Sequence, residues 1–425
     1  MSNVIRLPRP RALRPTPSRL GYYLRVGRNE HREVAHILGE GERAYLGLVI
    51  DAPHAHRHRE LVTEASRIGL DVVLDPKTQP AALVGGFSES LGGLPWHSGR
   101  QSVLSDFKGL EGQRRAAAIA KFASDRGFSA VLAPTHIISG AEDPWFEADL
   151  SVAAALKRML PSNVAVFYSL AVSMQVLRDS AARQRIVEGL RRVDVDALWL
   201  KVENFGADAT GEKVRAYIEA LAEFHSLDIP IISDHVGGIP ALSLVAFGAA
   251  GGVSHGVMVL EGFRASSWRR PPSGNPRTPP HRVYVHALDM LVSRAQAEAL
   301  LNHSTRVKGQ HACRNPSCCP RGARDMLEQP VRHYLYSRAR EIEALGAIPH
   351  SMRVQHLMER VVRPRSDAVA SAAALGVADN RLAATLQDRH IAMGRLRGAL
   401  SNLAETFEPR SIAQLPLSRP QREER

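Results

Sequence analysis

The feature that most constrains the fold is a repeated alternation of short, β-branched apolar runs with segments of helical periodicity. This alternation indicates successive βα units around a parallel sheet. The low aromatic content of 5% also suits helices packed around such a sheet better than an all-β sandwich. Eight runs are present, the number at which a sheet closes into a (β/α)8 TIM-type barrel. They are residues 22–27, 44–51, 71–75, 129–136, 163–170, 196–203, 229–235 and 251–257.

Nearly every run ends in polar residues. In barrels of this type the reactive groups lie where the strands pass into the following loops, so this repeated placement predicts a site there. Helix caps and turns would explain any one of these residues equally well. The predicted catalytic residues are Asp75, Asp234 and His255, and the predicted substrate-binding residues are Gln79, His136 and Glu203.

Two glycines, Gly237 and Gly238, follow the seventh run. Glycines after the late strands of many barrels let backbone N–H groups approach a phosphate, so we assign both to substrate binding. A turn that requires positive φ explains them as well.

All three cysteines lie in one segment, HACRNPSCC, which supplies Cys313, Cys318 and Cys319. Clustered thiols in a reducing compartment indicate metal binding, and thiolate with imidazole suits Zn²⁺ with four ligands. His311 precedes the cysteines, and His333, His350 and His356 follow them. Adjacent cysteines rarely place both sulfurs on one ion, which leaves open whether Cys318 and Cys319 are both ligands.

The formal charge is +12, with basic stretches before residue 20 and from Arg264 to Arg282. Such stretches attract phosphate backbones, although solvated surfaces explain them equally well. No run is long enough to span a membrane and no secretory signal is visible, so we expect a cytoplasmic protein without a membrane partner.

The stretch 333–361 (HYLYSRAREIEALGAIPHSMRVQHLMERV) resembles the C-terminal zinc subdomain of tRNA-guanine transglycosylases, in which a cysteine cluster is followed by a helix with a Leu-Gly turn and a ligand histidine. Leu345-Gly346 matches the turn, and His350 matches the histidine when small gaps are allowed. The resemblance implies a zinc site of Cys313, Cys318, Cys319 and His350. Asn315 stands where the family has its middle cysteine.

The resemblance extends weakly through residues 60–361. DVVLDPKTQ (71–79) is similar to the family segment that carries the acid/base aspartate, here Asp75, with Gln79 near the family's glutamine. Segment 236–257 is similar to the one that leads to the nucleophilic aspartate, but His255 occupies that place and Asp234 is the nearest carboxylate. The resemblance implies a pentosyltransferase of the base-exchange type that acts on tRNA or DNA.

The resulting hypothesis is a basic arm at 1–20, a barrel at 21–305, a zinc-binding subdomain at 306–362 and a helical extension with a charged tail at 363–425. We expect helix from residue 283, and two helices in 366–405 that form a dimer surface or cover the barrel. Two alternatives remain open. His54, His56 and His58 are typical of a metal-dependent amidohydrolase, and the chain could also be a non-catalytic barrel that binds nucleic acid.

Overall fold

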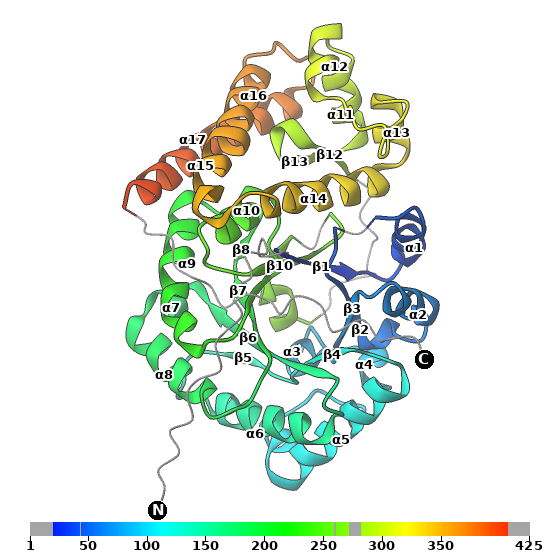
Figure 1. Ribbon diagram of the computed structural model, residues 1–425, viewed down its shortest axis with the longest axis vertical. Helices are drawn as coiled ribbons and strands as arrows, with labels where there is room; N and C mark the ends of the chain where they lie inside the picture. The colour runs from blue at the N-terminus through cyan, green and yellow to red at the C-terminus, as the bar shows by residue number, and fades with distance from the viewer. Residues whose placement is uncertain (1–19, 43, 259–260, 272–281, 407–425) are drawn as a thin grey trace, which may run out of the picture.

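A computed structural model describes residues 20–42, 44–258, 261–271 and 282–406. Within these ranges eight parallel strands form a closed ring, in which β1 pairs with β10 and β4 pairs with β6 (Figure 1). The (β/α)8 barrel is therefore confirmed, and each strand falls within or overlaps a predicted run. The strands are β1 (Gly21–Val26), β2 (Gly47–Asp51), β3 (Asp71–Asp75), β4 (Ala130–Leu132), β6 (Ala165–Ser173), β7 (Ala197–Glu203), β9 (Ile231–Asp234) and β10 (Gly252–Gly256).

Alternate residues of these strands fill the inside of the ring. The rings of Phe167 and Trp199 are stacked at 5.7 Å between centroids, and Tyr23 meets Trp199 edge-on at 5.1 Å. Val73 and Ile232 complete the same buried cluster. Because side chains alternate between the two faces of a strand, Arg25 follows Tyr23 into the interior one layer higher. The alternation of side chains along β1 thus places the Arg25 guanidinium group above the buried aromatic cluster.

Eight helices surround the ring, and the last of them is α14, which packs against β1, α1 and α10. Residues 257–329 are therefore inserted between the last strand and the eighth outer helix. Shorter elements α3 (Thr78–Ala81), α4 (Glu89–Gly92), α7 (Met174–Arg178), β5 (Ile137–Ile138), β8 (Phe205–Gly206) and β11 (Gly262–Phe263) occupy the connections. The eight outer helices are α1 (His31–Gly39), α2 (Arg59–Arg67), α5 (Gly109–Asp125), α6 (Pro144–Met159), α8 (Ser180–Leu190), α9 (Gly211–Phe224), α10 (Gly238–Ala246) and α14 (Pro330–Gly346).

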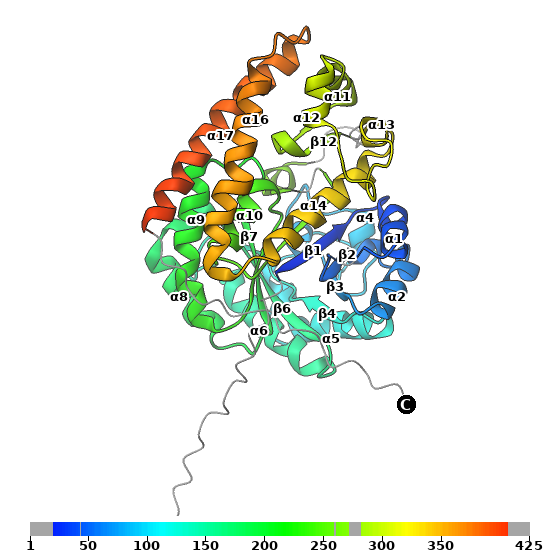
Figure 2. The same ribbon diagram turned by 45° about the horizontal axis from the view of Figure 1, so that its top comes forward.

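The inserted and C-terminal segments form an added layer on one side of the barrel (Figure 1). Figure 2 shows α16 and α17 lying side by side, with α17 running along α9. The layer consists of β12 (Val283–Val285), β13 (Met290–Val292), α11 (Arg294–Leu301), α12 (Thr305–His311), α13 (Ala323–Glu328), α15 (Arg353–His356), a π-helical turn (Leu357–Val362), α16 (Arg363–Ala373) and α17 (Asn380–Thr406).

The expectation of helix from residue 283 is wrong for its first ten residues, which form the antiparallel hairpin β12–β13. Asp289 sits at the turn in the left-handed region, with φ of 46°, which interrupts a helix. One 3-10 turn (His286–Leu288) lies within the hairpin, and α-helix begins at Arg294, where the Ser293 hydroxyl caps α11 by accepting from the backbone N–H of Gln296.

The two helices expected within 366–405 are present as α16 and α17. The buried side of α17 carries Leu386, Met393, Leu396, Leu400 and Leu403 at helical spacing. A Cβ on Gly211 of α9 would lie 2.7 Å from the Ala399 Cβ. The close approach of α17 to the outer ring therefore requires glycine at that position.

A buried ionic cluster joins the added layer to the barrel. Arg338 of α14 is 3% exposed and donates to Glu261 at 2.7 Å, and to Asp289 and Glu341 at 2.9 Å each. Arg365 of α16 also pairs with Glu341. Removing one partner from such a cluster leaves a charge buried without compensation, which typically costs about 3–5 kcal/mol.

The pH dependence of folding reports on this junction. Burial raises the pKa of Glu261 from 4.5 to about 7, despite the opposing charge of Arg338. The folded protein therefore holds a proton that the unfolded chain releases between about pH 4.5 and 7, so this group's contribution to stability is present at low pH and is lost as pH rises through that window. At 1.36 kcal/mol per pKa unit the change is up to about 3 kcal/mol.

We expect the unchanged protein to lose stability relative to the Glu261→Gln variant as pH rises from 4.5 to 7. The quantity that should fall is the free energy of unfolding of the unchanged protein minus that of the variant. Urea denaturation at a series of pH values measures both proteins. Other titrating groups cancel in the difference, and a pH-independent difference would contradict the assignment.

Candidate functional site

The mouth of the barrel is organised around Arg25. Its Nε and Nη2 donate to the two carboxylate oxygens of Asp234 at 2.7 and 2.6 Å, and its Nη1 donates to Asp75 at 2.8 Å. All three residues are buried, with Asp234 fully inaccessible and Asp75 5% exposed. Two of the predicted catalytic carboxylates are thus brought together by one guanidinium group that the sequence analysis did not single out.

Three further charged groups complete this mouth cluster. Lys201, from the end of β7, lies 3.7 Å from a carboxylate oxygen of both Asp75 and Asp234. Lys77 lies 3.2 Å from Asp51, whose side chain is 28% exposed. Three carboxylates therefore face three cations, and the cluster is neutral when all six groups are charged.

The mutual charges hold the carboxylates ionised. Burial alone would raise the pKa of Asp234, but Arg25, His235 and Lys201 outweigh it and keep that pKa well below its usual range. Lys201, Lys77 and Arg25 do the same for the pKa of Asp75. Burial lowers the pKa of Lys201 in spite of Asp75, so its ammonium form is the least stabilised of the cations. An ionised carboxylate is a nucleophile or base, and an amine with a depressed pKa exchanges protons readily.

Backbone strain gathers at the same rim. Lys77, Asn204 and His235 follow β3, β7 and β9, and each has φ near +58°, a conformation uncommon for residues other than glycine. Such conformations concentrate at functional sites.

Gln79 lies beside the cluster and its amide is fully engaged. Its Nε2 donates to the hydroxyls of Thr135 and Ser169, each at 3.2 Å, and its Oε1 accepts from Lys201 at 2.9 Å. In this conformation Gln79 positions the Lys201 amine and offers no amide group to a substrate.

A segment from the β10 loop covers the mouth. Phe263, Ala265 and Trp268 pack on Ala171 of β6. Arg269 donates two parallel hydrogen bonds to the Glu203 carboxylate, one of them 2.8 Å long. The backbone N–H of Gly85 donates to the Trp268 carbonyl at 2.7 Å. Glu203, predicted to bind substrate, thus fastens this cover in the structure.

Two predicted residues point away from the mouth. His136 packs outward on α6, where its Nδ1 pairs with Asp149 at 2.7 Å and its ring stacks on Trp145 at 3.7 Å. His255 pairs in register with Leu24, on the outer face, and its ring lies 4.7 Å from that of Tyr22. Its Nδ1 is also 3.2 Å from the Tyr334 hydroxyl of α14. The catalytic assignment of His255 and the substrate-binding assignment of His136 therefore do not agree with the side-chain directions.

The two glycines at the start of α10 serve the layer junction. The Ile239 N–H donates to Asp289 at 2.9 Å. A Cβ on Gly238, whose φ is +64°, would lie 2.9 Å from that carboxylate, and one on Gly237 would overlap Glu261. A helix N-terminus attracts anions, and here the chain's own carboxylates take that position. Gly237 and Gly238 therefore make room for these two carboxylates, and their role in substrate binding stays a prediction.

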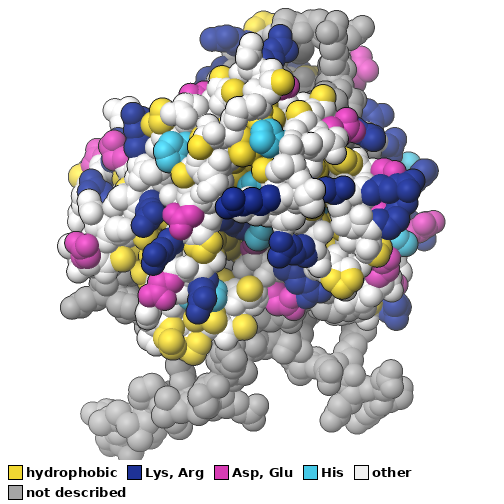
Figure 3. Space-filling view, turned by 90° about the horizontal axis from the view of Figure 1, so that it is seen from above, with side chains coloured by type: hydrophobic (Ala, Val, Ile, Leu, Met, Phe, Trp, Pro, Cys, Tyr) yellow, Lys and Arg dark blue, Asp and Glu magenta, His cyan; other side chains and the backbone are white. Residues whose placement is uncertain are grey.

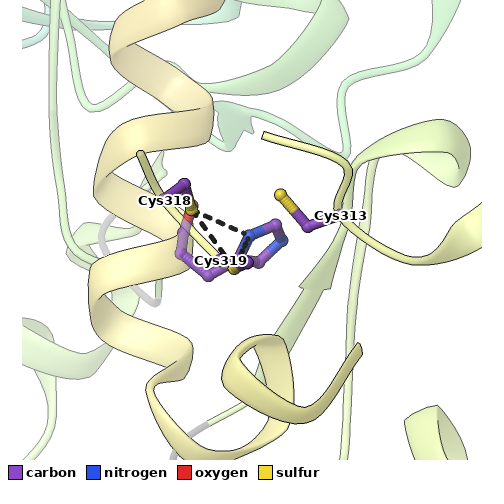
Figure 4. A group of neighbouring side chains, drawn as sticks. Cys313, Cys318 and Cys319 are labelled. Atoms are coloured by element: carbon purple, nitrogen blue, oxygen red, sulfur yellow. Dashed lines mark hydrogen bonds between the residues drawn. The ribbon is translucent and has the colours of Figure 1, made fainter. Parts of the chain in front are cut away.

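The three cysteines meet His333 in the added layer, and Figure 4 shows the cysteines gathered beside a helix. The sulfurs of Cys318 and Cys319 lie 3.3 Å apart and 3.4 and 3.5 Å from the His333 Nδ1. Around a tetrahedral zinc with the usual bond lengths, sulfurs would be about 3.8 Å apart and sulfur and nitrogen about 3.5 Å apart. The four ligand atoms all lie within 4.8 Å of one another.

The surroundings of His333 suit a metal ligand. Its Nε2 lies 2.9 Å from the Tyr284 carbonyl, so the proton belongs on Nε2 and the Nδ1 lone pair faces the sulfurs. Metal-bound histidines are commonly oriented by such a bond. The Cys3His group could therefore hold a metal such as zinc.

His350, the predicted fourth ligand, is not a member of this group. It opens a short 3-10 turn (His350–Met352) beyond the far end of α14, whereas His333 lies in the first turn of that helix, beside the cysteine loop. The sequence held two signs against His350. It matches the family's histidine only when gaps are allowed, and His333 lies nearer to the cysteines, 14 residues after Cys319.

The histidines of the amidohydrolase alternative do not form a comparable group. His56 is exposed, and the rings of His54 and His58 are 6.0 Å apart. Among the described residues, Cys313, Cys318, Cys319 and His333 form the one group of three or more potential metal ligands that lie close enough to share an ion.

No family model matches this sequence, and no curated protein matches it. Three similar solved structures are deoxyribose phosphate aldolase from Aeropyrum pernix (15% identity, 56% of this chain and 85% of that one, TM-score 0.34), the xylanase 10B modules of Clostridium thermocellum (10%, 56% and 59%, 0.34) and the carboxyl transferase domain of Rhizobium etli pyruvate carboxylase (12%, 92% and 62%, 0.38). None of these three is a tRNA-guanine transglycosylase. Similarity at this level says nothing about chemistry. No helix among the described residues is both long and apolar enough to cross a membrane.

Replacing His333 and His350 separately by alanine tests which histidine is a metal ligand. We expect His333→Ala and Cys318→Ser to lose bound zinc, which should be about one ion per chain in the unchanged protein, because a structural site needs all four ligands. His350→Ala should retain it. Elemental analysis of purified proteins, with thermal melting to detect the accompanying loss of stability, makes the measurement.

The opposite pattern would restore the assignment made from sequence. Zinc lost in His350→Ala and kept in His333→Ala would show that the cluster geometry is misleading.

Proposed function

We propose that the protein is an enzyme that exchanges a base at a glycosidic bond of a nucleic acid, with its chemistry in the barrel mouth and a structural zinc in the added layer. The observation that carries the proposal is the pair of ionised carboxylates, Asp75 and Asp234, held by Arg25 at the ends of β3 and β9. The resemblance of residues 71–79 and 333–361 to tRNA-guanine transglycosylases supports the same reaction class.

The two carboxylates have different roles in this proposal. Asp234 is fully buried and gives both oxygens to Arg25, so it fixes the guanidinium group. Asp75 is the less enclosed of the two and is the nucleophile. Its oxygen attacks the sugar carbon of the glycosidic bond, and the base departs with the bonding electrons. An incoming base then displaces the carboxylate and restores it.

Lys201 supplies the proton balance. It lies 3.7 Å from Asp75, and burial depresses its pKa, so its ammonium form readily gives a proton to the departing base. The resulting amine recovers a proton from the incoming base. Gln79 keeps the amine in place through the 2.9 Å bond to its carbonyl oxygen.

Access to Asp75 requires the cover to move. The Glu203–Arg269 pair at its edge leaves Arg269 about half exposed and within reach of a substrate, whereas the Glu203 side chain is 8% exposed. A substrate phosphate near the mouth would compete with Glu203 for Arg269, so the bond that fastens the cover is also one that a polyanion would open.

A covalent trap tests the nucleophile. We expect the unchanged protein, incubated with tRNA or DNA, to form an adduct that survives denaturation, and Asp75→Asn to reduce adduct and base exchange on the order of a thousandfold or more. Asp194→Asn is the matched control, because Asp194 is exposed and precedes β7 at the opposite end of the barrel. Thermal melting verifies that each variant is folded.

Other outcomes select other functions. An adduct that persists in Asp75→Asn removes Asp75 as nucleophile. Binding that falls steeply with salt, without adduct or exchange, indicates the non-catalytic nucleic-acid-binding barrel. Metal-dependent hydrolysis lost in His54→Ala indicates the amidohydrolase.

A further inference from the structure

The added layer contains a cavity of 630 Å³ between α12, the cysteine loop, α14 and α16. It adjoins a second cavity of 390 Å³, and the two share His286, Ala287 and Arg340 as walls. Small-molecule sites in proteins generally occupy about 300–1,000 Å³. Neither cavity is lined by a residue of the mouth cluster, so the proposed base exchange assigns them no role. Three residues of the Cys3His group, Cys313, Cys318 and His333, form one wall of the larger cavity, so a ligand there would lie beside the proposed zinc site.

We propose that the larger cavity binds a small anionic ligand with a flat, largely apolar body, of the size and chemistry of a nucleoside monophosphate. The binding site is independent of the chemistry proposed for the barrel mouth.

The apolar body is indicated by the walls. Ala287, Ala312, Ala368 and Tyr336 line the cavity from four different segments of the layer. A free phosphate ion would leave these surfaces in contact with water, whereas a heterocycle would cover them.

A buried ring nitrogen of His311 indicates where the ligand's heterocycle would be recognised. His311 is 4% exposed, lines the cavity, and its Nδ1 has no hydrogen-bond partner among the described residues. A buried polar atom without a partner typically costs about 1–3 kcal/mol. A ligand heteroatom would satisfy it.

The charge of the rim indicates the anionic group. Arg314 is exposed and donates to the Gly309 carbonyl, and within the described ranges no carboxylate pairs with it. Arg340 contributes a second guanidinium group, shared with Glu42 and Glu343. The acidic group of the lining, Asp367, is 66% exposed and lies 3.8 Å from Arg397. Figure 3 shows Lys and Arg side chains spread over the face seen from above, among acidic and hydrophobic ones.

Adenosine 5′-monophosphate is a suitable probe, with adenosine and inorganic phosphate as its two halves. Isothermal titration of the full chain should give one site, with each half at least tenfold weaker than the whole. Arg314→Ala should weaken binding about tenfold or more, because it removes a charge-assisted contact. Ala368→Phe should also weaken binding, because it places an aromatic ring inside the cavity that the ligand would occupy.

Arg306→Ala is the matched control, because Arg306 is an exposed arginine on α12, eight residues before Arg314, and lines neither cavity. It should bind as the unchanged protein does. Asp75→Asn should also bind normally, which separates this site from the barrel mouth.

No binding at millimolar concentration would overturn the proposal. So would phosphate binding as tightly as the nucleotide, or affinity unchanged in both Arg314→Ala and Ala368→Phe. Should Ala368→Phe fail to fold in thermal melting, the exposed Arg314→Ala variant decides.

Discussion

Burying a guanidinium group is costly unless carboxylates compensate its charge, and the buried Arg25 and Arg338 each gather several carboxylates in this way. Arg25 draws carboxylates from β3 and β9 into the barrel mouth, while Arg338 draws them from the β10 loop, the hairpin and its own helix. Apart from Glu341, which lies on the same helix as Arg338, the partners come from segments far apart in the chain. Because leaving any of these charges unpaired is costly, the mouth and the junction with the added layer are fixed by the same constraint.

The barrel could be predicted because its signals are local. Each strand is a run of apolar residues and each end carries polar ones, so Asp75 and Asp234 were found without knowledge of their partners. Arg25 was missed because an arginine inside an apolar run, YYLRVG, gives no local sign of its role, and Asp234 lies 209 residues away. The predicted catalytic role of His255 disagrees with its side-chain direction for a related reason. The pattern located the strand end but not the face, and one residue separates the interior from the exterior of a strand.

In the added layer the family resemblance and the geometry indicate different histidines. Alignment favoured His350, yet metal ligands are selected by position in space, and the first turn of α14 brings His333 to the sulfurs. Similarly, Gly237 and Gly238 predicted a phosphate site from a motif common to many barrels. Their lack of Cβ atoms is indeed required, but by Asp289 and Glu261, which arrive from an insertion whose path no local pattern reveals. The hairpin that carries Asp289 was itself expected to be helix.

The occupied helix end also limits how a substrate can bind. In a barrel with a free α10 N-terminus, backbone N–H groups would hold a phosphate beside the late strands. Here the Ile239 N–H is satisfied by Asp289, and a second anion would meet two carboxylates. Phosphates of any nucleic acid at the mouth must therefore be held by side chains such as Arg269, whose partner Glu203 fastens the cover. Under the proposed function, binding and opening would depend on the same guanidinium group, because a phosphate that occupied it would release Glu203.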